Sequence, residues 1–137
     1  MITAKDYFGF LAGHRLLTPH IEDAAADLLV RVNALLDTAS ASGVTLEINP
    51  ITRTLVSGNG SGGWRMPASM IGAPNSAHKS GQAVDVYDPD GDLDDWCLDN
   101  LETLEALGLY LEHPAATKGW CHLTTRAPRS GKRVFYP

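Results

Sequence analysis

Three side chains that could bind one metal ion lie in the second half of the chain. His78 and Asp85 are seven residues apart, and His122 follows far downstream. Imidazole nitrogens and carboxylate oxygens are zinc ligands, and three protein ligands leave one of zinc's four tetrahedral positions open for water. This set of donors is typical of a catalytic zinc site rather than a structural one.

The composition bounds what else the protein can be. The chain has 137 residues, of which 44% are hydrophobic, so we expect a single domain over residues 1–137 with one core, and a monomer. Eleven basic and sixteen acidic side chains give a net charge of −5, and no Lys/Arg run interleaves with aromatic residues. This pattern argues against a nucleic-acid groove. The two cysteines are expected to be reduced thiols.

No segment suggests a membrane or export role. Nothing in the chain approaches the roughly 18 apolar residues of a membrane span. The start has no apolar stretch after a basic head, which is the pattern of a signal peptide. We therefore expect no membrane span and a protein that is cytoplasmic at synthesis.

The apolar spacing predicts three helices and five short strands. A first helix over residues 4–11 follows Thr3 as cap, and a longer one begins after Thr18 and stops at Gly43. The third helix covers residues 93–107. The predicted strands are residues 44–48, 54–56, 84–87, 109–111 and 122–124. These elements predict an α+β domain with a small antiparallel sheet covered by helices.

Three further segments have plainer interpretations than their composition first suggests. The glycine-rich residues 57–63 lack the Gly-Lys-Ser/Thr ending of a phosphate-binding loop, so a flexible loop at a rim is expected. The aspartates from Asp85 to Asp95 lack the distal glutamate of a calcium loop, which favours turn and helix-cap roles. The basic residues of the tail, from Arg126 to Arg133, are expected to form a solvated surface.

A family resemblance supports the metal hypothesis. The Ser-x-His-x-x-Gly-x-Ala-x-Asp string of residues 76–85 resembles the zinc-binding signature of the D-Ala-D-Ala carboxypeptidase and L-alanyl-D-glutamate endopeptidase family, whose fold is shared by the hedgehog signalling domain. Gly-Trp-Arg-Met-Pro at 63–67 is similar to the family's Gly-Tyr-Arg segment. Residues 71–75 resemble its Gly-Gly lead-in, and Trp-Cys-His at 120–122 its terminal Trp-x-His. These motifs keep the family order over residues 63–122.

The resemblance implies a role for each matching residue. His78, Asp85 and His122 would bind Zn²⁺ and lower the pKa of a water molecule that attacks an amide carbonyl. Arg65 would hold a terminal carboxylate or the oxyanion of the substrate, and its alternative is a surface arginine in a loop. Ser76 either donates to the same substrate group or fastens the loop.

The general base is the least determined part of the site. Many members of the family have a glutamate three positions before the last histidine, and Gly119 stands there in this chain. Glu112 is the nearest acidic candidate, because residues 113–118 can form a turn that folds it back over the metal. The alternative for Glu112 is an exposed or salt-bridged side chain. His113 is a second candidate.

Two neighbours of His122 have structural roles in this hypothesis. Trp120 is expected to pack beneath the site and limit solvent. Cys121 and His122 would point to opposite faces of a strand, so Cys121 is expected to be buried rather than to act as a nucleophile.

The resemblance implies a hedgehog/DD-peptidase-like zinc metallopeptidase that hydrolyses amide bonds in peptidoglycan stem peptides, of D-Ala-D-Ala or L-Ala-D-Glu type. Small single-domain members resemble phage or prophage lysis enzymes, which act on the cell wall after release from the cytoplasm. The alternative is a catalytically silent zinc-binding module that binds the wall or serves as a phage structural or interaction part.

Overall fold

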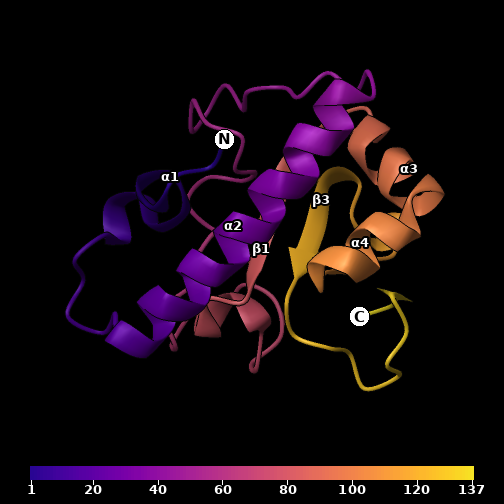
Figure 1. The fold of residues 1–137 in the computed structure, drawn as a ribbon. Coiled ribbons are helices and arrows are strands. Elements are labelled where there is room, and N and C mark those ends of the chain that lie inside the picture. The colour runs from indigo at the N-terminus through magenta and orange to yellow at the C-terminus, as the bar shows by residue number, and fades with distance from the viewer.

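The computed structural model describes residues 1–137 and shows helices packed against a small four-stranded sheet, an α+β arrangement (Figure 1). Three single 3-10 turns join the regular elements. The helices are α1 (Ala4–Phe8), α2 (Pro19–Ala41), α3 (Asp92–Asp99) and α4 (Leu101–Leu107), the 3-10 turns are η1 (Gly9–Leu11), η2 (Ala77–Ser80) and η3 (Pro114–Ala116), and the strands are β1 (Ala83–Asp88), β2 (Tyr110–Glu112), β3 (Gly119–Thr124) and β4 (Val134–Phe135).

The first two helices begin where the capping signals predicted. Thr3 and Asp6 form a capping box, in which each side chain accepts a hydrogen bond from the other residue's backbone N–H. Thr18 Oγ1 accepts from the N–H of Ile21, and Pro19 occupies the first position of α2. The predicted helix over residues 4–11 is α-helical only to Phe8, after which the chain tightens into η1.

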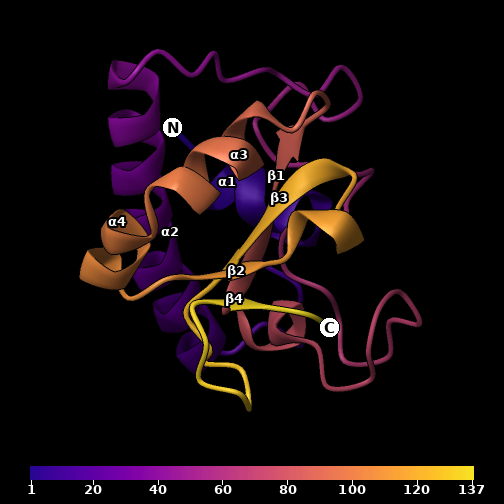
Figure 2. The ribbon, with the colours of Figure 1, turned by 90° about the vertical axis from the view of Figure 1, so that its right-hand side faces the viewer.

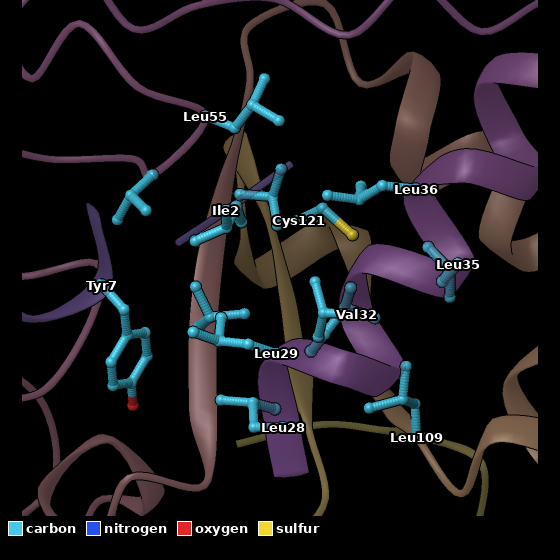
Figure 3. Close-up of a cluster of buried hydrophobic side chains, with 14 of the residues drawn as sticks. Ile2, Tyr7, Leu28, Leu29, Val32, Leu35, Leu36, Leu55, Leu109 and Cys121 are labelled. Carbon is cyan, nitrogen blue, oxygen red and sulfur yellow. The ribbon is translucent and has the colours of Figure 1, made fainter. Parts of the chain in front are cut away.

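A single apolar cluster joins α2 to the sheet. Twenty-three buried residues form it, and α2 contributes one continuous face that includes Leu28, Val32 and Leu35. Figure 3 shows Leu29 and Val32 of α2 extending toward the strands. Burial of this stripe, at about 25 cal/mol per Å² of apolar surface, is the main force that holds the sheet in place beneath α2.

The sheet is mixed rather than purely antiparallel, with the strand order β1-β3-β2-β4. β3 pairs antiparallel with β1 and β2, as predicted, but β4 pairs parallel with β2. Arg133 stabilises this unexpected edge: it donates to Leu109 O at 2.8 Å, and its guanidinium carbon lies 4.3 Å from the centre of the Tyr110 ring. Arg133 is therefore half-buried and does not belong to a solvated basic surface.

Two predicted strands do not form. Residues 44–48 have no partner strand, and residues 54–56 contribute only an isolated bridge between Val56 and Val86. Asn49, which is 2% exposed, donates through its side chain to Val56 O and Gly58 O and accepts from the N–H of Ile51. These bonds close a local loop over residues 49–58, which leaves residues 54–56 with only the short bridge to β1.

The predicted helix over residues 93–107 is divided at Asn100. This residue leaves helical geometry, with φ −133° and ψ 47°, and its side chain donates to Trp96 O at 2.8 Å. A short amide side chain competes in this way with the helix backbone. Upstream, Asp88 accepts from the N–H groups of Leu93 and Asp94, so the helix-cap role predicted for the aspartate run is confirmed for this one residue.

Both cysteines are free and fully buried, as expected for reduced thiols. The helices include no candidate for a membrane span. The three predicted metal ligands lie on β1, β3 and η2.

Candidate metal centre

The three predicted ligands converge where β1, β3 and η2 meet. Asp85 lies in β1 directly opposite His122 in β3, and these two strands run side by side in Figure 2. Asp85 Oδ1 is 2.8 Å from His122 Nδ1 and 3.3 Å from His78 Nε2. One nitrogen or oxygen atom from each of the three residues lies within 4.8 Å of the others. The predicted triad is therefore a cluster of potential metal ligands.

A backbone carbonyl fixes the orientation of His78. Its Nδ1 is 2.9 Å from Gly63 O, and the side chain is buried. Because a carbonyl oxygen only accepts hydrogen bonds, Nδ1 carries a proton, and Nε2 is the nitrogen that faces Asp85 and is left to bind a metal ion. Metal-binding histidines are typically held through their second ring nitrogen in this way.

Gly63 must lack a side chain for its carbonyl to reach His78. A Cβ atom at Gly63 would lie 1.8 Å from Tyr7 O, so the two backbones touch here. Tyr7 is itself fixed, because its hydroxyl donates to Ala83 O at 2.8 Å. The glycine-rich segment therefore ends as a packed part of the site, in contrast to the loose rim loop that we expected.

Asp85 is a buried carboxylate with a different partner for each oxygen. Burial by itself raises its pKa, but the charge of His78 and hydrogen bonds from both imidazoles hold the pKa well below its usual range. Oδ1 faces the two histidines, and Oδ2 accepts from Arg65 at 3.3 Å. The carboxylate is therefore ionised and oriented with one oxygen toward the ligand side.

The donor set fits a divalent cation. Two neutral imidazoles and one carboxylate are ligands that first-row metal ions accept, and their single negative charge offsets part of the charge of a dication. The 2.8 Å contact between Asp85 Oδ1 and His122 Nδ1 requires a proton, since two lone pairs would repel each other. A metal ion held by Asp85 and His122 would take the place of that proton.

Arg65 is held on three sides. Its Nε donates to Ser61 O at 2.7 Å, one terminal nitrogen to Ile71 O at 3.3 Å, and the other to Asp85 Oδ2 at 3.3 Å. The side chain is only 11% exposed, which rules out the alternative of a surface arginine. A guanidinium carries five N–H donors, so two remain for another group in the cleft.

Ser76 fastens the turn that carries His78. Its Oγ accepts from the N–H of His78 at 3.2 Å and caps η2. Of the two predicted roles, this is the one visible in the structure. The hydroxyl hydrogen is not used in that bond, and Ser76 also lines the cleft.

A cleft of about 500 Å³ opens over the ligands, and Glu112 of β2 lines it together with Arg65 and Ser76. None of the chain's four ion pairs involves Glu112, so the salt-bridged alternative is wrong. Burial raises the pKa of Glu112, while the charge of His122 acts in the opposite direction. All six residues predicted for the site share this cleft.

No protein-family model, curated protein or solved structure matches this chain. The chemistry of the site is therefore inferred from the geometry of the cleft. The three converging donors and the adjacent Glu112 carboxylate are its main features.

The second candidate base, His113, lies outside the cleft. Its Nδ1 accepts from the N–H of Ala115 at 3.0 Å, and its ring stacks on Tyr136 at 4.5 Å. Gly119 does not line the cleft either. Its φ of +100° favours glycine, so a glutamate at this position would strain the backbone.

The side chains of β3 point alternately into the cleft and into the core. Trp120, His122 and Thr124 line the cleft, whereas Cys121 and Leu123 are fully buried on the core side. This confirms that Cys121 and His122 face opposite ways. Trp120 is half-buried in the wall of the cleft, rather than beneath the site as expected.

Sequence reasoning missed the contribution of the C-terminal segment. Phe135 and Pro137 line the cleft, and the Phe135 ring is 6.2 Å from the ring of His122. Arg126, expected on a solvated surface, lines it as well. No local signal marks Phe135, because β4 has two residues and reaches the site only through its pairing with β2.

Proposed function

We propose that this chain is a zinc metallopeptidase with a hedgehog/DD-peptidase-like fold that hydrolyses amide bonds in peptidoglycan stem peptides. The observation that carries the proposal is the convergence of His78, Asp85 and His122 in a cleft that also contains Glu112. Amide hydrolysis needs a Lewis acid and a proton acceptor close together in an accessible site. The substrate class rests on the motif resemblance over residues 63–122.

His78, Asp85 and His122 would hold the zinc ion. When bound, zinc polarises a carbonyl and lowers the pKa of a water molecule. The Gly63 carbonyl keeps Nε2 of His78 turned toward the site. Arg65 engages Asp85 Oδ2 and so keeps Oδ1 on the ligand side. Because of the contacts from Gly63 and Arg65, His78 and Asp85 need little rearrangement when the metal binds.

Glu112 is the proposed general base. Its carboxylate has no ion-pair partner, and its pKa is raised by burial, so it is suited to take a proton from water. The same carboxyl oxygen then returns the proton to the leaving amine. The amine is a stronger base than water, so the protonated carboxyl group passes its proton to the amine rather than to solvent.

Arg65 and Ser76 are proposed to bind the substrate. Two N–H groups of Arg65 and the hydroxyl hydrogen of Ser76 are free of the bonds that hold these residues. In both D-Ala-D-Ala and L-Ala-D-Glu bonds, the leaving residue carries a carboxylate next to its amine. A guanidinium is suited to that carboxylate, which would orient the scissile bond over the metal.

A catalytically silent zinc-binding module is the second candidate. Gly119 favours it, because the glutamate expected at that position is missing. Such a module would bind the cell wall or a phage structural partner without cleaving it. Glu112 in the cleft favours the enzyme, which as a phage or prophage lysis enzyme would reach the wall after release from the cytoplasm.

The two candidates differ in a direct assay. The purified chain is incubated with cross-linked sacculi and with muramyl peptides, and newly released free amines are measured. A peptidase releases amines, loses this activity with a chelator and regains it with zinc. A chain that binds one zinc ion per molecule but releases no amines from either substrate is the silent module. His78→Ala serves as the metal-deficient control.

A further inference from the structure

Arg126 binds the segment that carries His78 at three points. One terminal nitrogen of its guanidinium donates to Asn75 O at 2.8 Å, and the other donates to Ser80 Oγ at 2.8 Å. Its Nε donates to Gln82 Oε1 at 3.2 Å. The three acceptors lie on both sides of His78 in the chain, so a single side chain holds the whole turn.

The same arginine belongs to the end of β3. Its backbone N–H donates to Thr124 Oγ1 at 3.0 Å. The Thr124 hydroxyl in turn donates to Gln82 O at 2.8 Å, and the N–H of Thr125 donates to the same oxygen at 3.0 Å. The backbone that follows His122 is thus tied to the residue just before β1.

The turn needs such a tie because it has little regular structure of its own. η2 has only four residues, and irregular chain precedes it. Ser80 Oγ donates to Gln82 Oε1 at 2.7 Å, so two of the acceptors are held to each other. Hydrogen bonds from a cation are about twice as strong as neutral ones, so the guanidinium is a strong tie between this turn and the end of β3.

We propose that Arg126 is a positioning residue of the metal centre. By clamping the His78 turn onto the end of β3, it sets the separation between His78 and His122 that a single cation requires. This inference needs the three metal ligands only, and it stands whether or not the chain is a peptidase.

Geometry and charge predict opposite effects for Arg126. As a cation lining the same cleft, Arg126 by its charge alone opposes the binding of a dication. If only the electrostatic repulsion between Arg126 and the zinc ion mattered, removing the charge would tighten zinc binding. If the clamp matters, removing the guanidinium weakens zinc binding, even when a positive charge remains.

The test compares zinc dissociation constants, measured by competition with a chromophoric chelator, for the unmodified chain, Arg126→Lys and Arg126→Gln. Lysine keeps the charge but cannot donate to three acceptors in the geometry of the fork. We expect both variants to bind zinc about 10- to 100-fold more weakly, as for outer contacts of other metal sites. The thermal midpoint of each variant, measured with chelator present, reports on folding separately.

Arg31→Lys is the matched control. Arg31 also donates to a backbone carbonyl, Leu107 O at 2.7 Å, but it joins α2 to α4 away from the cleft. We expect it to lower the thermal midpoint without changing zinc affinity. Unchanged zinc affinity in folded Arg126→Lys, tighter binding in Arg126→Gln, or an equal loss in Arg31→Lys overturns the proposal.

A second variant keeps the test decisive if Arg126→Gln does not fold. Gln82→Met removes the Nε acceptor and leaves Arg126 in place. We expect a smaller loss of zinc affinity in the same direction. In the double variant with Arg126→Lys, the two losses should be less than additive, because both changes break one clamp. Full additivity contradicts a shared role.

Discussion

Asp85 and His122 are paired residues of β1 and β3, with Asp85 Oδ1 2.8 Å from His122 Nδ1. Backbone hydrogen bonds of the sheet fix the separation of these two ligands. His78 is placed differently, by the Gly63 carbonyl and the contacts of a single turn. Substitutions in the sheet and in the turn should therefore affect the metal site in different ways.

Substitution of a metal ligand should weaken metal binding without unfolding the protein. His122 points into the cleft, so His122→Ala makes no cavity in the core, and Asp85→Asn keeps nearly the same volume. We expect zinc affinity to fall by more than about 100-fold in each, beyond the loss for an outer contact. Competition with a chromophoric chelator measures the affinity, with His113→Ala as a control that binds zinc as the unmodified chain does. Unchanged zinc affinity in His122→Ala would remove His122 from the ligand set.

Glu112→Gln should separate catalysis from metal binding. Glutamine keeps the shape but cannot accept the proton, so we expect kcat for stem-peptide hydrolysis to fall by roughly 10²- to 10⁴-fold. Zinc content should not change, because Glu112 is not among the converging ligands. Glu105→Gln, at an exposed position of α4, is the matched control. Undiminished activity in Glu112→Gln would show that another group acts as the base.

The predictable parts of this fold have local signals. Thr3 and Thr18 cap helices through backbone groups three residues away, so their roles can be read from neighbouring residues. The opposite facing of Cys121 and His122 follows from the geometry of any strand. The converging triad was predictable because two motifs fix residue types locally, one around His78 and Asp85 and one at residues 120–122.

The missed parts depend on contacts between distant segments. Arg126 and Arg133 looked like members of a solvated basic run, yet each donates to backbone carbonyls far away in the chain. Their neighbours Arg129 and Lys132 are exposed, as predicted. Charge alone cannot distinguish the two pairs, because burial of a guanidinium depends on which acceptors the fold brings within reach. β4 escaped prediction for the same reason, since two residues carry no periodicity.

Gly63→Ala should weaken metal binding through the backbone. The added Cβ would lie 1.8 Å from Tyr7 O, so the carbonyl that holds His78 must move. We expect a loss of stability of about 1–3 kcal/mol by urea unfolding, together with weaker zinc binding. Gly131→Ala is the control: its φ is +68° and nothing lies within 4 Å, so it should cost stability without changing zinc affinity. Equal zinc affinity in both variants would contradict this role of Gly63.

Asp94 should make the stability of the metal-free chain depend on pH. It is 3% exposed, its Oδ1 has no hydrogen-bond partner, and Thr117 donates to its Oδ2 at 3.3 Å. Burial, together with the nearby charge of Asp88, raises the pKa of Asp94 from 3.8 to about 7. The folded state therefore favours the protonated carboxyl, and the unfolded state does not. Its contribution to stability is fully present below about pH 4 and is lost as the pH rises through about 7.

Asp94→Asn should remove this dependence, because the amide stays neutral. Three pKa units correspond to roughly 4 kcal/mol, so we expect the variant to gain up to that amount relative to the unmodified chain between pH 4 and pH 8. Urea unfolding in the presence of a chelator measures the difference at each pH, and the subtraction cancels the titration of Asp85 and other groups. Asp92→Asn, which removes a carboxylate at an exposed position of the same helix, is the control for the loss of one charge. A flat difference for Asp94→Asn would mean that Asp94 titrates alike in the folded and unfolded chains.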